Sequence, residues 1–118
     1  LHTGLMVSAF HQALDAAGVH RLHGIEVRTI SQGLKTWTLD TSMGKLQTKN
    51  VGICTNGLAA QLIEGLDVQP VPNRVGSDRR PLIGETRPGL HHAVRMGGMG
   101  VAIGAGIGRE LAENMLGT

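Results

Sequence analysis

The residues best suited to chemistry lie near the end of the chain, where glycines gather at an expected helix start. This segment runs Met96-Gly97-Gly98-Met99-Gly100-Val101-Ala102-Ile103-Gly104, and the helix is expected to continue to Leu116. The first amides of a helix have no partner within it and lie at the positive end of the helix dipole. Such amides suit a phosphate, a carboxylate or the electron-rich edge of a ring cofactor. The segment therefore predicts a ligand-binding helix start, which glycine leaves open because it has no Cβ.

The same glycines also allow a second interpretation, as a dinucleotide-binding turn between a strand and a helix. Gly104 and Gly106 fit the first two glycines of that fingerprint, but Arg109 stands where the third is needed. No later strand with an acidic residue for a ribose follows in this sequence. We therefore favour a helix starting near Gly100, in which Gly104 and Gly108 lie one turn apart and allow close packing against a sheet or a cofactor.

A second possible ligand loop follows the apolar run 51–54. It consists of Thr55, Asn56 and Gly57, and a short helix is expected after it. In open α/β sheets, nucleotides bind where a strand ends and a helix begins. Thr and Asn are equally suited to a plain helix cap and turn, so the residues alone leave both interpretations open.

Histidine, cysteine and serine give no pattern for a metal site or a nucleophile. The adjacent His91 and His92 would point to opposite faces of a strand, and no zinc-ligand spacing occurs among the histidines. We therefore expect surface histidines, no metal site and no identifiable catalytic residue. Cys54 lies within an apolar run, which favours a packing role and a reducing, cytoplasmic compartment. The six histidines are His2, His11, His20, His23, His91 and His92.

Composition limits the classes of protein to which the chain can belong. Its 118 residues suffice for one small domain, and 41% of them are hydrophobic. Phe10 and Trp37 are the only aromatic residues, so the core must be built from aliphatic side chains. The net charge is +2, and the eleven Lys and Arg residues are scattered along the chain except for Arg79-Arg80. The absence of a basic stripe argues against nucleic-acid binding. The longest apolar stretch is shorter than the roughly 20 residues that a membrane span needs.

Hydrophobic periodicity predicts an α/β arrangement that could position the two candidate loops. Thr3 is expected to cap a first helix, which Gly18 ends. The middle of the chain predicts an antiparallel β-meander with a turn at Gly44. In the short helix after residue 57, Leu58, Leu62 and Ile63 are expected to face inward. The expected strands cover residues 19–22, 25–30, 34–39, 51–54, 82–83 and 90–96, with an extended segment over 68–75.

Two blocks of the sequence resemble the FAD-dependent amine and amino-acid oxidoreductases, the family of glycine oxidase, D-amino-acid oxidase and dehydrogenase, and sarcosine oxidase. The first block comprises residues 5–19, Gly24-Ile25-Glu26-Val27-Arg28-Thr29-Ile30 and the segment 44–57, which ends in Cys54-Thr55-Asn56-Gly57. The second is Asp78-Arg79-Arg80-Pro81-Leu82-Ile83-Gly84, followed by residues 97–104. The blocks occur in the family's order and cover nearly the whole chain.

The resemblance implies a binding role for eight residues of this chain. Val27 would offer its backbone to the adenine of FAD. Thr55, Asn56 and Gly57 would lie beside its adenosine and pyrophosphate. Four further residues would supply backbone amides to the pyrimidine edge of the flavin, which gains negative charge on reduction. These four are Gly98, Met99, Gly100 and Val101.

The resemblance also implies parts that this sequence lacks. The family's glycine-rich turn (GxGxxG) and its acidic ribose ligand would precede residue 1, and much of the substrate domain would stand near residues 75–77. We therefore interpret residues 1–118 as a single partial FAD-binding domain with a Rossmann-like α/β fold, an antiparallel meander and a C-terminal helix that starts with glycine. Residues 1–75 would form its nucleotide side and residues 76–118 its flavin side.

The implied function is that of a fragment of an oxidoreductase that transfers hydride from a small-molecule amine or amino acid to FAD. We expect the isolated chain to be inactive. The alternative is a non-catalytic subunit or interaction module that completes a flavin or nucleotide site with a partner chain, or as a homo-oligomer. A small nucleotide-binding fold unrelated to flavins is also open.

Overall fold

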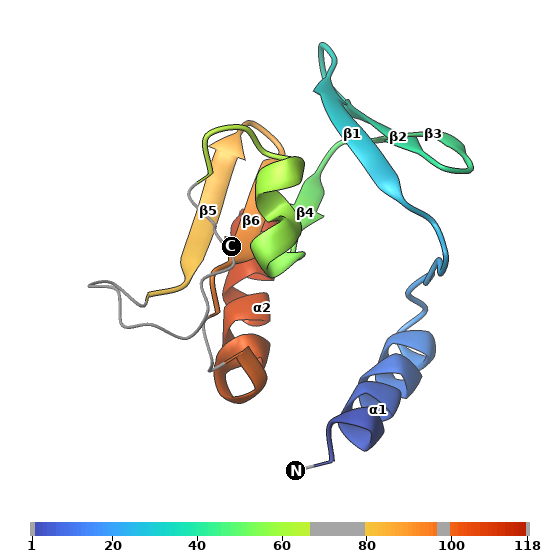
Figure 1. Cartoon of the computed structure of the whole chain (residues 1–118), viewed down its shortest axis with the longest axis vertical. Helices are drawn as coiled ribbons and strands as arrows, with labels where there is room; N and C mark the ends of the chain where they lie inside the picture. Colours follow the sequence, from blue (N-terminus) through green and yellow to red (C-terminus); the bar gives the residue numbers. More distant parts are fainter. Residues whose placement is uncertain (1, 67–79, 97–99, 118) are drawn as a thin grey trace.

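The chain folds into two small sheets and two long helices, an arrangement of the mixed α/β class (Figure 1). The computed structural model describes residues 2–66, 80–96 and 100–117, so the expected extended segment over 68–75 lies outside it. The elements are α1 (Thr3–Ala16), β1 (Val27–Gln32), β2 (Trp37–Thr41), β3 (Gly44–Thr48), β4 (Val51–Ile53), the 3₁₀ helix η1 (Asn56–Gln61), β5 (Leu82–Arg87), β6 (Leu90–Val94) and α2 (Gly100–Leu116).

The predicted β-meander is confirmed as an antiparallel sheet in the order β1-β2-β3. Gly44, the first residue of β3 after the turn from β2, has a φ of +119°, a conformation that glycine adopts without steric cost. The expected strand over 34–39 instead begins at Trp37. The amide of Gly33 bonds to the carbonyl of Thr36, so the residues between them form a bend and Leu34 is fully exposed.

The second sheet has the order β4-β6-β5, with β4 parallel and β5 antiparallel to β6. One of its faces, together with η1 and Trp37, forms the larger core cluster. The expectation that Leu58 faces inward is wrong, because its side chain is 60% exposed. A 3₁₀ helix has three residues per turn, so Ala59 and Leu62 share the inner side and Leu58 does not. The buried residues of the larger cluster are Trp37, Val51, Ile53, Ala59, Ile63, Leu90 and Val94.

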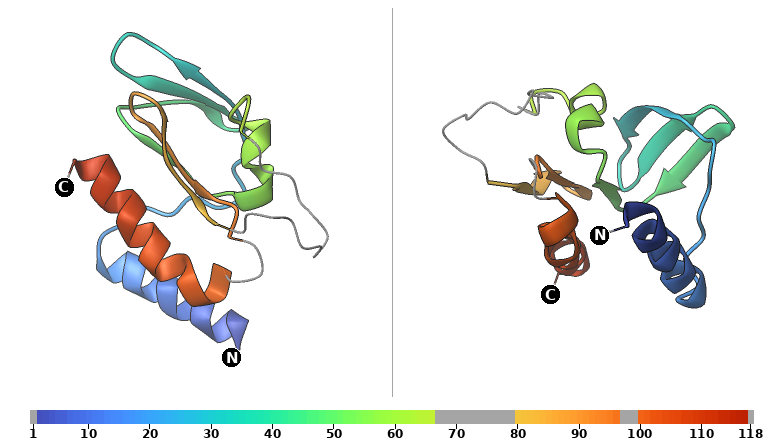
Figure 2. Two further views of the ribbon diagram at one scale, coloured as in Figure 1. Left: turned by 90° about the vertical axis from the view of Figure 1, so that its left-hand side faces the viewer. Right: turned by 60° about the horizontal axis from the view of Figure 1, so that its bottom comes forward.

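Helix α2 packs on the other face of this sheet and begins at Gly100, as predicted (Figure 2). Its close approach depends on Gly52 of β4, where a Cβ would lie 3.2 Å from the Met115 sulfur. The expectation that Gly104 and Gly108 allow close packing against the sheet is wrong, because a Cβ at either position would meet nothing within 4 Å. Gly104, Gly106 and Gly108 of α2 therefore face open space, and the glycine that allows the close approach of the helix is Gly52 in the sheet. The packing of Gly104 and Gly108 against a cofactor stays a prediction.

Helix α1 stands apart from both sheets and has no buried residue (Figure 1). It is capped by His2, not by Thr3, because the amide of Leu5 donates to the ring Nδ1 of His2 at 3.2 Å. Gly18 ends the helix with a φ of +76°, as predicted. Leu5 and Phe10 are 68% and 53% exposed, so the apolar face of α1 is not covered by the part of the chain that the structure describes.

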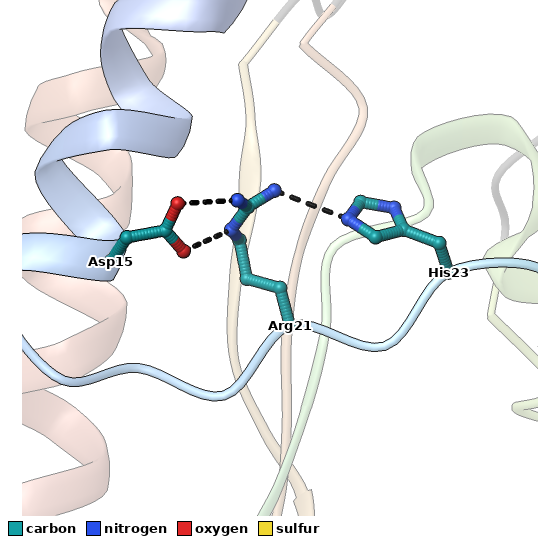
Figure 3. A network of polar contacts seen from close by, with 3 residues as sticks. All are labelled: Asp15, Arg21 and His23. Carbon is teal, nitrogen blue, oxygen red and sulfur yellow. Dashed lines mark hydrogen bonds and ion pairs between the residues drawn. The ribbon is translucent and has the colours of Figure 1, made fainter.

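The segment after α1 is held by a polar network, and the expectation of a strand over 19–22 is wrong. The Asp15 carboxylate accepts hydrogen bonds from Arg21 Nε at 2.8 Å and Nη2 at 2.6 Å (Figure 3). Arg21 Nη1 also lies 3.1 Å from His23 Nε2. The hydrogen bond from Arg21 lowers the pKa of Asp15. This bidentate ion pair fixes the connection between α1 and β1 at the surface. Residues 19–22 have no neighbouring strand there, within the described chain, with which to pair, so they do not form a strand.

The expectation of surface histidines is wrong for His91, which is only 5% exposed. It lies on β6, the central strand of its sheet, and both faces of that strand are covered. His91 Nε2 is 3.7 Å from Glu85 Oε1, and its Nδ1 is buried without a hydrogen-bond partner among the residues described. His92 faces the opposite side, where its Nδ1 lies 2.9 Å from the Thr86 hydroxyl. Opposite orientations of the two rings are as predicted.

Acid is expected to destabilise the fold through His92. Burial lowers the pKa of His92 below its ordinary 6.5, and the nearby His91 lowers it further. The unfolded chain therefore takes up the proton first, so the free energy of unfolding falls as pH drops below about 6.5 and goes on falling until the folded-state pKa is reached. Urea unfolding at pH values from about 8 to 5 should show a smaller loss in His92→Asn than in the unchanged chain. Equal losses would contradict the assignment to His92.

Candidate functional site

The candidate site lies at the edge of the second sheet where the parallel strands β4 and β6 end. Because these strands are parallel neighbours, their carboxyl ends open on the same side, and the helices η1 and α2 follow beyond them. Each strand is followed by a residue with positive φ, Asn56 at 49° and Arg95 at 65°. Residues other than glycine rarely adopt this conformation, and those that do gather at functional sites.

Asn56 joins the two strand ends. Its side-chain Oδ1 accepts hydrogen bonds from the amide of Arg95 at 2.8 Å and from that of Met96 at 3.2 Å. The sequence indicates Asn56 as a candidate ligand-binding residue but gives no sign that it binds the chain after β6. The partners are 39 and 40 residues away, so only the pairing of β4 with β6 brings them together.

A first cavity of about 530 Å³ lies between the meander and the second sheet. Val27, at the start of β1, and Thr55, just after β4, both line it. The structure thus brings together two residues that the resemblance assigns to the adenine and the adenosine side of one cofactor. Apart from Glu26, Arg28, Thr55 and Gln61, the lining is apolar, with Ile30, Ile53 and Leu62 among its members.

A second cavity of about 590 Å³ lies between α1 and α2, and Asn56 forms part of its wall. Phe10 and Leu14 of α1 face it from one side, and Gly104 and Gly108 of α2 from the other. The remaining lining residues are Cys54, Ala93, Met96 and Ile107. Asn56 is the one residue of this lining with a polar amide, so the cavity suits a flat apolar group that makes a polar contact at the strand ends.

The expectation that Cys54 packs in the core is wrong, because β4 ends at Ile53 and Cys54 is exposed beside the second cavity. Partial burial of the thiol raises its pKa. A raised pKa leaves less of the reactive thiolate at neutral pH. Cys54 is therefore a wall residue of this cavity and a poor nucleophile.

Three other predicted site residues, Gly57, Gly100 and Val101, lie outside the linings of these two cavities. Gly57 is partly buried in η1. Gly100, the first residue of α2, is also partly buried, and a Cβ there would lie 3.2 Å from Met96 Cβ. Val101 is 57% exposed. The remaining two, Gly98 and Met99, lie outside the residues that the structure describes.

Two other kinds of site are absent from residues 2–66, 80–96 and 100–117. No group of three or more His, Cys, Asp or Glu side chains there is placed to hold a metal ion. None of the helices in these ranges combines the length and apolar character needed to cross a bilayer.

The geometry of the strand ends therefore carries the functional argument. Asn56, which binds the start of the connection to α2, forms part of the wall of the second cavity, and the predicted residues Val27 and Thr55 line the first. Comparison with models of protein families, with curated proteins and with solved structures found no match to this chain.

Proposed function

We propose that this chain is the FAD-binding part of an oxidoreductase that acts on amines or amino acids. The observation that carries the proposal is the joining of two parallel strand ends by Asn56, next to the start of α2. In open α/β sheets, nucleotide cofactors bind outside the carboxyl ends of the strands. The family resemblance of residues 5–57 and 78–104 supplies the identity of the cofactor as FAD, within a Rossmann-like domain.

The residues present fit the two ends of such a cofactor. Each cavity has a volume within the range of about 300–1,000 Å³ that small-molecule sites occupy. The largely apolar walls suit flat rings, and Val27 is among the residues that line the first cavity. Asn56, in the wall of the second cavity, directly follows Thr55, in the wall of the first, and the polar middle of a dinucleotide would pass here. These features support one ring system in each cavity.

The chain would also tune the cofactor through α2. FAD supplies the redox chemistry when bound, by accepting a hydride from the substrate carbon that carries the amine. The amides of Gly98 to Val101 would lie against the flavin pyrimidine edge. The positive end of the helix dipole there would stabilise the negative charge that arises on reduction. We assign no catalytic residue.

Titration with FAD tests the proposal. Addition of the purified chain should quench flavin fluorescence in a saturable way. In Asn56→Gly the affinity should fall about tenfold or more, because loss of Oδ1 leaves two amides without their acceptor and frees the strand ends. Glycine accepts the positive φ of this position, so backbone strain is not added.

The matched control is Asn50→Gly, since Asn50 is exposed and lies before β4. This variant should bind FAD as the unchanged chain does, and circular dichroism should show both variants folded. Absence of saturable quenching, or equal affinities in the two variants, would overturn the proposal. We also expect no amine-dependent reduction of a dye by the chain alone.

The exposed apolar face of α1 favours a second candidate function, that of an interaction module. Leu5, Phe10 and Leu14 are 68%, 53% and 39% exposed, which is unusual for the apolar face of a helix in a finished domain. In this role the chain would complete a flavin or nucleotide site together with a partner chain that carries a glycine-rich turn. Co-purification with such a chain from cells that express both distinguishes this role from that of a flavin-binding fragment.

A further inference from the structure

Asn56 is followed directly by a glycine, and in such a pair the asparagine side chain is open to attack by its own backbone. The attacking atom is the amide nitrogen of Gly57, which can reach the side-chain carbon Cγ of Asn56 by closing a small ring. Glycine has no Cβ, so no side chain hinders the nitrogen and the backbone can turn toward that carbon. The other described asparagines, Asn50 and Asn114, precede a valine and a methionine, whose side chains hinder the same attack.

The fold restrains this reaction through the contact that joins the strand ends. Asn56 Oδ1 accepts hydrogen bonds from the amides of Arg95 at 2.8 Å and Met96 at 3.2 Å. These bonds hold the side chain toward the chain that follows β6. The side chain must therefore leave both amides before Cγ can turn to the nitrogen of Gly57.

Three features make such a local opening possible. Asn56 is exposed, so water can replace the two amides and can also reach the ring that forms. Its φ of 49° is costly for a residue with a Cβ, which favours release from this conformation. The hydrogen bonding of η1 begins with the Leu58 amide, which donates to the Thr55 carbonyl at 3.1 Å. The amide of Gly57 precedes this first bond, so the helix does not need it.

We propose that Asn56 is a site of spontaneous deamidation, and that its contact with the chain after β6 sets the rate. The nitrogen of Gly57 loses its proton and forms a bond to Asn56 Cγ, the bond from Cγ to Nδ2 breaks, and Nδ2 leaves as ammonia. Water then opens the cyclic imide. Breaking the bond from the nitrogen to Cγ gives aspartate, and breaking the bond to the main-chain carbonyl carbon gives isoaspartate, in which the chain runs through Cγ.

The two products differ in what they do to the strand ends. Aspartate keeps an oxygen at the place of Oδ1 and can accept both hydrogen bonds, now with a negative charge that strengthens them. Isoaspartate adds one carbon to the main chain between β4 and η1 and moves the acceptor away from Arg95 and Met96. Either product places a negative charge in the wall of the second cavity, where Asn56 is neutral. The proposal concerns the chain's own covalent chemistry and does not depend on FAD.

Peptide mapping by mass spectrometry tests the site in the flavin-free chain, kept in a mildly alkaline buffer. Residue 56 should gain the mass difference between an –NH₂ and an –OH group, while Asn50 and Asn114 stay unchanged over the same time. A synthetic peptide of residues 52–60 lacks the contact to the chain after β6 and gives the rate of the open state. The intact chain should react about thirtyfold more slowly than this peptide, the factor that two hydrogen bonds of ordinary strength give.

Amide hydrogen exchange measures the same opening independently. The amides of Arg95 and Met96 are released when Asn56 leaves them, so their exchange in the intact chain should be slowed by a factor similar to that found for deamidation. In Asn56→Asp, which is the aspartate product, these two amides should stay protected.

Gly57→Ala is the matched variant for the chemistry. It adds a methyl group beside the attacking nitrogen and leaves Asn56 and its contact in place. Gly57 does not have a positive φ, so alanine adds no strain of that kind. Deamidation of Asn56 should become severalfold slower, while the protection of the Arg95 and Met96 amides should stay the same. Circular dichroism should show the variant folded.

Three results would overturn the proposal. Reaction of Asn56 no faster than that of Asn50 would show that residue 56 is not a preferred site. A rate in the intact chain equal to that of the peptide, or far from the rate that amide exchange implies, would show that the contact with Arg95 and Met96 does not control the reaction. Equal deamidation in Gly57→Ala would exclude attack by this nitrogen. Because no flavin is present, failure of FAD to bind would leave each of these results unaffected.

Discussion

Replacing Trp37 with alanine is expected to remove most of the stability of this protein. The side chain is 3% exposed within the larger core cluster, and its Nε1 donates to the carbonyl of Pro88 at 3.0 Å. Truncating a buried tryptophan costs about 3–5 kcal/mol, comparable with the whole stability of a small domain. Urea unfolding followed by far-ultraviolet circular dichroism measures the loss, because the variant has no tryptophan left to report by fluorescence.

Two variants separate the parts of this effect. Trp37→Phe keeps a ring in the core and loses the hydrogen bond, so we expect a smaller loss than with alanine. Leu34→Ala removes a side chain that is 105% exposed and should change stability by less than about 0.5 kcal/mol. If Trp37→Ala unfolds at nearly the same urea concentration as the unchanged chain, Trp37 does not hold the core as the structure indicates.

Gly89→Ala is expected to have the second largest effect, about 3 kcal/mol or more, because two costs add. Gly89 has a φ of +81°, which costs a residue with a Cβ about 1–2 kcal/mol. A Cβ there would also lie 2.6 Å from the carbonyl oxygen of Lys49 and 3.0 Å from Trp37 Nε1. Backbone and a buried ring would both have to shift, which adds about 1–3 kcal/mol.

Gly65→Ala is the matched control for this prediction. Its φ of +79° is nearly the same, but a Cβ there would meet nothing within 4 Å. It should therefore cost only the conformational part, about 1–2 kcal/mol. Thermal unfolding of both variants measures the difference. Similar losses in the two would mean that the contact around Gly89 is looser than the structure shows.

Both predictions concern the place where the two sheets meet. Trp37 belongs to the meander, while Pro88 and Gly89 form the turn between β5 and β6. The amide of Val51 donates to the carbonyl of Gly89 at 2.8 Å, so β4 is fixed at the same point. Loss of this contact should separate Val27 from Thr55 and open the first cavity. We therefore expect Trp37→Ala and Gly89→Ala to weaken FAD binding as well as stability.

Several elements could be predicted from the sequence because their signals are local. The start of α2 at Gly100, the end of α1 at Gly18 and the turn at Gly44 each follow from the conformational freedom of glycine beside periodic apolar residues. The meander follows from alternating side chains and short turns. The errors are local too: residues 19–22 resemble a strand in composition, but Arg21 holds them as a connection through Asp15.

Only some residues of the candidate site could be predicted from the sequence. The resemblance indicated Val27, Thr55 and Asn56, and the structure places them around two cavities. That Asn56 binds the backbone after β6 could not be foreseen, because the contact depends on the parallel pairing of strands nearly 40 residues apart. The burial of His91 depends in the same way on β6 taking the central place in its sheet.

By itself, then, the sequence determined the two long helices, the β-meander and the tight turns, since these depend on propensities and spacing within a few residues. Only the tertiary structure decided which strand edges pair, which stay free and which residues line one cavity. Those outcomes depend on contacts between distant segments, such as Trp37 with Pro88 and Gly52 with Met115. Such contacts form only when the elements pack together, so no local sequence pattern predicts them.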